Sequence, residues 1–172
     1  IYAGIVDAYS ELPPDASKND PALAELTGAK YWNAQVTPQL RADRIYKPDA
    51  EANKKLRSQG IVARLVAPSR GVLKGTSTLV TTPDDDATRS ILKPTVAQHA
   101  AVTVERSFDE SRGYPNSPMG AYALLRQAIY DALWYRDSQA AWRADPTLPR
   151  PEHNDALAAL DQDRARTHLQ NP

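Results

Sequence analysis

The sequence predicts an α/β fold in which parallel strands carry polar side chains to one edge of a sheet. Residues 1–6 form an apolar run that leads into Asp7, Tyr9, Ser10 and Glu11, as in a buried strand ending at the mouth of an α/β barrel. A helical segment and a second strand follow within about sixty residues, which is the order of a parallel β-loop-α-β unit. The chain has 172 residues, 41% of them hydrophobic, enough for one domain with a real core.

Charge and composition exclude several classes of protein. Lys plus Arg and Asp plus Glu each number 21, so no global field draws the chain to nucleic acid or to an anionic membrane. The absence of Cys excludes disulfides and thiolate ligands, and it suits a periplasmic or secreted protein. No run approaches the ~20 apolar residues of a membrane span, and no signal peptide opens the chain. Because the sequence begins without Met inside an apparent strand, we expect a piece of a longer protein.

The elements after the first strand follow from local signals. Residues 12–29, which include Pro13 and Pro14, predict a long loop with at most a helical turn at residues 21–26, and residues 31–41 show no clear period. Pro48 and Asp49 start a helix over residues 50–59, and Gly60 ends it. Residues 61–67 then form the second strand.

Residues 68–77 form a loop that contains Arg70, Lys74 and Gly75. The order is not that of a phosphate-binding P-loop, because the lysine precedes the glycine. The simpler interpretation is a strand-to-strand loop whose glycines adopt positive φ. The alternative is that Arg70, Lys74 and backbone N–H groups line a site for an anionic group. A short β-prone stretch, residues 78–82, comes next.

The second half of the chain predicts one long helix between strands. Residues 84–86 are an acidic, solvated turn, residues 91–94 are short and apolar, and residues 97–104 form a third strand with His99 as a core residue. Ser117 and Pro118 start a helix that runs to about residue 144. We expect this helix to pack over one face of the sheet. Its apolar stripe consists of Tyr122, Leu125, Ile129, Leu133 and Trp134.

The end of the chain predicts a linker, a helix and the start of a strand. Residues 145–151 contain three prolines and form the linker. Residues 152–163 form the helix, with Ala156, Leu157 and Leu160 facing inward, and residues 164–169 begin the strand.

Four stretches together resemble the amidohydrolase superfamily, in particular the imidazolonepropionase-related, uncharacterised amidohydrolase-like proteins. They read G-I-V-D-A-Y-S-E-L (residues 4–12), W-N-A-Q-V-T-P-Q-L-R (32–41), Q-G-I-V-A-R-L-V-A-P-S-R-G-V-L-K-G (59–75) and Y-P-N-S-P-M-G-A-Y-A-L-L-R-Q-A (114–128). The resemblance implies a (β/α)8 TIM-type barrel. Since a complete barrel needs ~250 residues, we expect residues 1–172 to be one domain, the N-terminal portion of that barrel, with about four to five strands and long loops. The rest of the barrel, or a second polypeptide, would be its partner.

The resemblance also implies a divalent metal, usually zinc, that activates water for hydrolysis of a C–N bond in a small-molecule substrate. The first two ligands of the family are the histidines of an H-x-H motif, and Tyr9 and Glu11 stand at those positions. Glu11 retains a ligating oxygen, whereas Tyr9 marks a lost ligand. The next ligand would be His168, and the loop with Arg70, Lys74 and Gly75 would contact substrate.

Two other functions remain open at the level of sequence. The loss of both H-x-H histidines favours a catalytically inactive relative without a metal, which serves as a binding or assembly subunit. A sugar- or peptide-binding module unrelated to the superfamily would instead use exposed aromatic residues, with candidates Tyr31, Trp32, Tyr114, Trp134 and Trp142.

Overall fold

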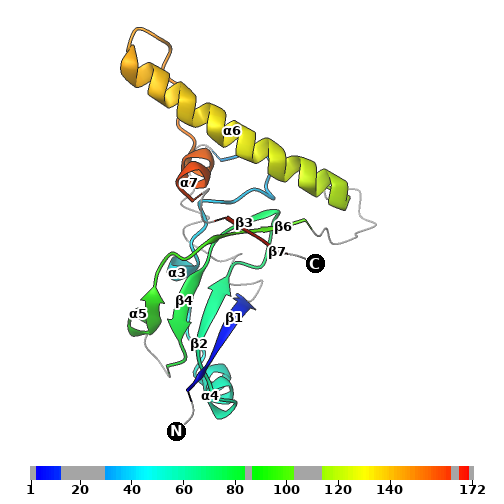
Figure 1. The fold of residues 1–172 in the computed structure, drawn as a ribbon, viewed down its shortest axis with the longest axis vertical. Helices are drawn as coiled ribbons and strands as arrows, with labels where there is room; N and C mark the ends of the chain where they lie inside the picture. The colour runs from blue at the N-terminus through cyan, green and yellow to red at the C-terminus, as the bar shows by residue number, and fades with distance from the viewer. Residues whose placement is uncertain (1–2, 13–29, 84–86, 103–113, 164–166, 171–172) are drawn as a thin grey trace.

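The computed structural model describes residues 3–12, 30–83, 87–102, 114–163 and 167–170 as a mixed α/β fold. In these residues the strands form two sheets, one of four strands in the order β1-β2-β4-β5 and one of three in the order β3-β6-β7 (Figure 1). The elements in chain order are β1 (Ile5–Glu11), α3 (Ala42–Ile45), α4 (Ala50–Ser58), β2 (Ile61–Ala67), β3 (Leu73–Thr76), β4 (Thr78–Thr81), α5 (Ala87–Ser90), β5 (Ile91–Lys93), β6 (Gln98–Ala101), α6 (Pro118–Ala144), α7 (Asp155–Asp163) and β7 (Thr167–Gln170).

The sheets are mixed rather than purely parallel. The β1–β2 and β6–β7 pairs are parallel as expected, but β2–β4, β4–β5 and β3–β6 are antiparallel. The described residues contain no closed barrel, and the sheet that begins with β1 is open. Within the four-stranded sheet, ten residues (68–77) separate β2 from β4 and nine (82–90) separate β4 from β5. These connections are shorter than the dozen or more residues that a crossover between parallel neighbours needs, so the strands pair antiparallel.

The first strand differs most from the sequence-based expectation. β1 runs through the residues expected to form a polar tip, and its apolar start is not buried: Ile5 and Val6 are each 58% exposed. Among the described strands β1 pairs only with β2, so it is an edge strand of the sheet. Its apolar residues are exposed because no described strand pairs with its other side.

Most other elements lie where local signals placed them. The Asp49 carboxylate caps α4 by accepting from the backbone N–H groups of Glu51 and Ala52, and Gly60 follows with φ 85°. Ser117 caps α6 in the same way through Gly120 N–H. The loop expected at residues 68–77 contains β3, and the short helices α3 and α5 were not expected. The possible turn at residues 21–26 and the acidic run at 84–86 lie outside the described residues.

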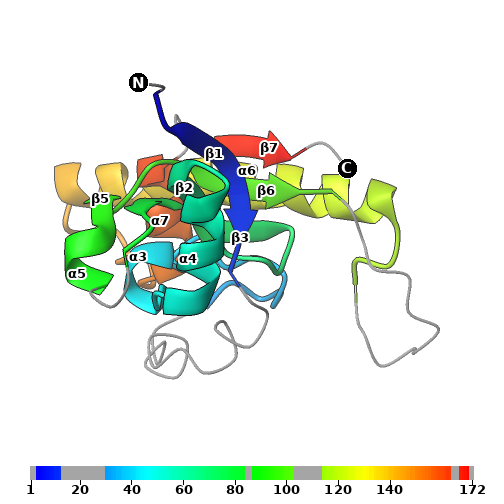
Figure 2. The same cartoon turned by 90° about the horizontal axis from the view of Figure 1, so that it is seen from below.

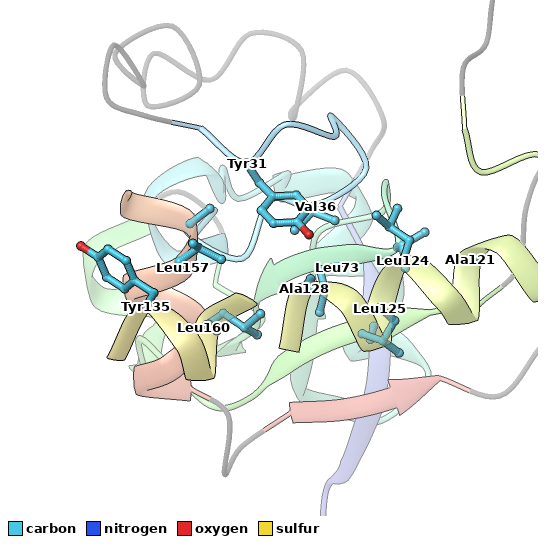
Figure 3. Packing of buried hydrophobic residues seen from close by; sticks show 14 residues of the cluster. Tyr31, Val36, Leu73, Ala121, Leu124, Leu125, Ala128, Tyr135, Leu157 and Leu160 are labelled. Carbon is cyan, nitrogen blue, oxygen red and sulfur yellow. The ribbon is translucent and has the colours of Figure 1, made fainter. Parts of the chain in front are cut away.

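The largest core cluster joins α6 and α7 to the three-stranded sheet (Figures 1 and 3). Helix α6 therefore covers a sheet, as expected, but with a different face. Tyr122 and Trp134, expected inside, are exposed, and Leu133 is half-buried. Leu125 is buried, as predicted, and Ile129 is partly buried against the core. The other buried residues of α6, which were not predicted, are Ala121, Leu124, Ala128, Ala132 and Tyr135. In α7, Ala156, Leu157 and Leu160 are buried, as predicted.

A second cluster fills the space beside the four-stranded sheet. It joins α3 and its flanks to β2 and β4, and its members are Leu12, Leu40, Ala42, Ile45, Tyr46, Val66 and Val80. Figure 2 shows β1 crossing near β3, β6 and β7. The two sheets meet where Glu11 of β1 contacts Lys74 of β3 and the Tyr9 ring of β1 lies near the His99 ring of β6.

Candidate functional site

Tyr9, Glu11 and Lys74 form a closed polar cluster between the two sheets. Tyr9 and Glu11 are two residues apart on β1 and so project from the same face of the strand. The Tyr9 hydroxyl donates to Glu11 Oε1 at 2.6 Å, and Lys74 Nζ donates to the same oxygen at 2.9 Å. Lys74 Nζ also lies 3.5 Å from the Tyr9 hydroxyl oxygen. Three of the residues singled out from the sequence thus contact one another.

The two charges of this cluster differ in their exposure to water. The Lys74 side chain is 7% exposed, while that of Glu11 is 45% exposed. Burial by itself would raise the pKa of Glu11, but the hydrogen bond from Tyr9 and the hydrogen bond and charge of Lys74 outweigh it. The pKa of Glu11 is consequently lowered from its ordinary value of 4.5. Glu11 is therefore an anion at neutral pH, and it neutralises a buried ammonium.

Strand β3 holds Lys74 in this position. Leu73 and Gly75 pair with Ala100 and His99 of β6, with an irregular register between them. Gly75 has φ 109°, and a Cβ there would overlap the backbone carbonyl of Leu40. Glycine is thus required for the chain to pass Leu40 at this point. Gly75, which was expected to contact substrate, is buried, and its close approach to Leu40 accounts for the glycine.

The strand register also brings His99 and His168 beside the cluster. His99 is buried, as expected for a core residue, and its ring lies 5.7 Å from the Tyr9 ring between centroids. In the parallel β6–β7 pair, His168 is the register partner of His99. Sequence patterns could not indicate that His99 adjoins the site, because Tyr9 and its register partner His168 are far from it in the chain.

Arg70 stands apart from the cluster. It is exposed in the connection between β2 and β3. Within the described residues no hydrogen bond or ion pair joins it to Glu11 or Lys74. Arg70 and Lys74 are therefore not brought together as the expected anionic site would require.

The donor set does not fit a divalent metal. A metal held by Glu11 would lie near the Lys74 ammonium. A double and a single positive charge about 4 Å apart repel by roughly 2 kcal/mol in water and by roughly 8 kcal/mol at an effective dielectric constant of ~20. One of the two Glu11 carboxylate oxygens, Oε1, already accepts two hydrogen bonds. Over the described residues, no three His, Cys, Asp or Glu side chains gather so that they could hold a metal ion.

The candidate aromatic residues do not form one surface. Tyr31 is buried, and its hydroxyl donates to Asp131 Oδ2 at 2.6 Å. Trp32 and Tyr114 are exposed and stack with a centroid distance of 6.5 Å. The remaining two lie along α6: Trp134 is exposed, and Trp142 lies under the guanidinium of Arg150. In the described part of the chain, no helix is long and apolar enough to cross a membrane.

Comparison with solved structures identifies the fold. The chain is similar to the crystal structure of an amidohydrolase from Thermotoga maritima MSB8, with a TM-score of 0.69 and 16% sequence identity. The match covers 92% of this chain and 41% of that one, so the chain spans less than half the length of the Thermotoga protein. No protein-family model matches the sequence, and no curated protein matches it. The chain therefore has a partial amidohydrolase-like fold, as the sequence motifs suggested.

Proposed function

We propose that this chain is the N-terminal part of a TIM-type, amidohydrolase-like barrel that serves as a metal-free binding or assembly subunit. The observation that carries the proposal is the ion pair of Lys74 and Glu11 at 2.9 Å. The resemblance implies that Tyr9 and Glu11 stand at the positions of the first two metal ligands, and the ammonium of Lys74 contacts this pair. Tyr9 strengthens the argument, because a phenol that donates to Glu11 cannot at the same time ligate zinc through an anionic oxygen.

Assembly has support from the strand order. Among the described strands β7 ends the three-stranded sheet and β1 ends the other, so each presents backbone groups along one side. The remainder of the barrel, in the same chain or in a second polypeptide, would pair there. The similarity that covers 41% of the Thermotoga chain leaves room for such a remainder.

Metal analysis of the purified protein tests the proposal. After incubation with excess Zn²⁺ and gel filtration, we expect well under one equivalent of zinc per chain. The Lys74→Met variant removes the competing ammonium and is expected to retain more zinc than the wild-type protein. Lys93→Met serves as the matched control, since Lys93 is an exposed lysine of β5. Stoichiometric zinc in the wild-type protein contradicts the proposal.

A second candidate function is metal-dependent hydrolysis of C–N bonds, with the site completed by residues from the rest of the barrel. The observation in its favour is the register that pairs His99 with His168 beside Tyr9. Two imidazoles on neighbouring strands are a usual beginning of a zinc site. Zinc binding that is lost in both His99→Ala and His168→Ala, and unaffected by His153→Ala, would favour this candidate over the first.

A further inference from the structure

Lys74 and Tyr9 together have the geometry of a receptor for one anionic oxygen. A buried ammonium needs a counter-charge, because it has lost most of its hydration. The hydroxyl of Tyr9 adds a second donor from another sheet. Both donors point at the same atom, Glu11 Oε1, at 2.6 Å and 2.9 Å. Convergence of a charged and a neutral donor on one oxygen is how proteins bind carboxylates tightly.

The oxygen in this receptor belongs to the most exchangeable member of the cluster. Lys74 lies inside β3, between the pairing residues Leu73 and Gly75, and the Tyr9 ring lies against the buried His99 ring. Glu11 is the last residue of β1, and its side chain is already 45% exposed. Turning the Glu11 carboxylate into water rehydrates it, and a ligand oxygen in its place restores the contacts with Lys74 and Tyr9. The Lys74 side chain, in contrast, is only 7% exposed and projects from a paired strand.

We infer that Lys74 and Tyr9 form a binding site for the carboxylate of a small molecule, and that Glu11 occupies this site when no ligand is bound. The ligand oxygen takes the position of Glu11 Oε1, and the total charge around Lys74 is unchanged by the exchange. A tethered competitor acts at an effective concentration on the order of millimolar or more. The wild-type protein therefore binds a simple carboxylate weakly, and removal of Glu11 exposes the full affinity. This inference rests on the proposed metal-free site.

Acetate is the probe, and Glu11→Ala is the variant that vacates the site. We expect acetate to raise the melting temperature of Glu11→Ala in a saturable way and to bind it at least about tenfold more tightly than it binds the wild-type protein, by isothermal titration calorimetry. Acetamide, the neutral analogue, and methylammonium are expected to have no effect. The double variant Glu11→Ala/Lys74→Met should lose the response to acetate. Glu51→Ala, which removes an exposed glutamate of α4, should behave as the wild-type protein does.

If Glu11→Ala fails to fold, Glu11→Gln replaces it, because glutamine keeps the volume of the side chain. The amide of glutamine competes less well than a carboxylate. Acetate should therefore still bind Glu11→Gln more tightly than it binds the wild-type protein. Equal affinity in the wild-type and Glu11 variants, or an equal response to acetamide, overturns the inference. Zinc content is measured on the same preparations. Stoichiometric zinc overturns the proposed function, while metal-free protein that ignores acetate overturns only the carboxylate site.

Discussion

The ion pair between Lys74 and Glu11 predicts an unequal response to the loss of either partner. Replacing Glu11 removes the carboxylate 2.9 Å from an ammonium that is only 7% exposed, whereas replacing Lys74 leaves a carboxylate that water already reaches. Breaking a buried pair from one side is costly, but substituting an apolar side chain of similar size for a buried charge is often close to neutral. Glu11→Gln should therefore destabilise the fold more than Lys74→Met.

The magnitude follows from the 2.9 Å separation and the exposure of Glu11. Coulomb's law gives about 1.4 kcal/mol for this distance in water and about 6 kcal/mol at an effective dielectric constant of ~20. Because the carboxylate is nearly half exposed, the lower limit is the better guide. We expect Glu11→Gln to lower the free energy of unfolding by about 1–2 kcal/mol and Lys74→Met by less than about 1 kcal/mol.

Urea denaturation of the two single variants and of the double variant measures these values. Once Lys74 is methionine, Glu11→Gln has no ammonium to strand, so the double variant should be more stable than Glu11→Gln alone. A Lys74→Met variant as unstable as Glu11→Gln, or additive losses in the double variant, would refute the reasoning. Either result would mean that Lys74 contributes to stability by packing rather than by its charge.

The same pair predicts a dependence of stability on pH. Interactions with Tyr9 and Lys74 lower the pKa of Glu11 below 4.5 in the folded protein, against the effect of burial. A lowered folded-state pKa means that the stabilisation is fully present above about pH 4.5 and is lost as the pH falls through the folded-state pKa. The stability difference between the wild-type protein and Glu11→Gln should be constant from about pH 5 to 7, where Glu11 is ionised. It should shrink as the pH falls below 4.5 and Glu11 becomes protonated. A stability difference between the two proteins that stays constant even at a pH where Glu11 is fully protonated would contradict this prediction.

Four further substitutions test the fold. Gly75→Ala should cost more than about 3 kcal/mol in urea denaturation, because its Cβ meets a backbone carbonyl. Gly60→Ala also has positive φ, but its Cβ meets only Ile5 Cδ1 at 4.0 Å, so it should cost about 1 kcal/mol. Tyr31→Phe removes the 2.6 Å hydrogen bond to Asp131 and should lower the free energy of unfolding by about 1–2 kcal/mol. An unchanged free energy of unfolding would show that this hydrogen bond does not stabilise the fold. Asp49→Ala removes the cap of α4 and should cost about 1 kcal/mol, measured by thermal denaturation.

The sequence predicted those features that depend on a few neighbouring residues. Capping by Asp49 and Ser117 involves backbone groups two or three positions away, so the starts of α4 and α6 followed directly from residue type. The boundaries of β2 agree with the prediction at residues 61–67, because an apolar run between a glycine and a proline leaves little choice.

Features that depend on distant contacts were not predictable in this way. Strand β3 exists because Leu73 and Gly75 pair with β6, some 25 residues later, and nothing in the Gly-containing segment itself indicates a strand. The buried face of α6 was misjudged because hydrophobicity favours Tyr122 and Trp134, while close packing against α7 and the sheet selects small residues such as Ala121 and Ala128.

The candidate site combines both kinds of information. Sequence comparison singled out Tyr9 and Glu11 as departures from an H-x-H motif, and separately singled out Lys74 as a cation near a glycine. Only the fold joins them, since the contact between Glu11 and Lys74 spans 63 residues. Tyr9 and Glu11, which stand where the resemblance implies two imidazoles, contact the buried ammonium of Lys74. The three form one hydrogen-bonded cluster in which the carboxylate and the ammonium carry opposite charges. Restoring the histidines at positions 9 and 11 without removing Lys74 should therefore not restore a metal site.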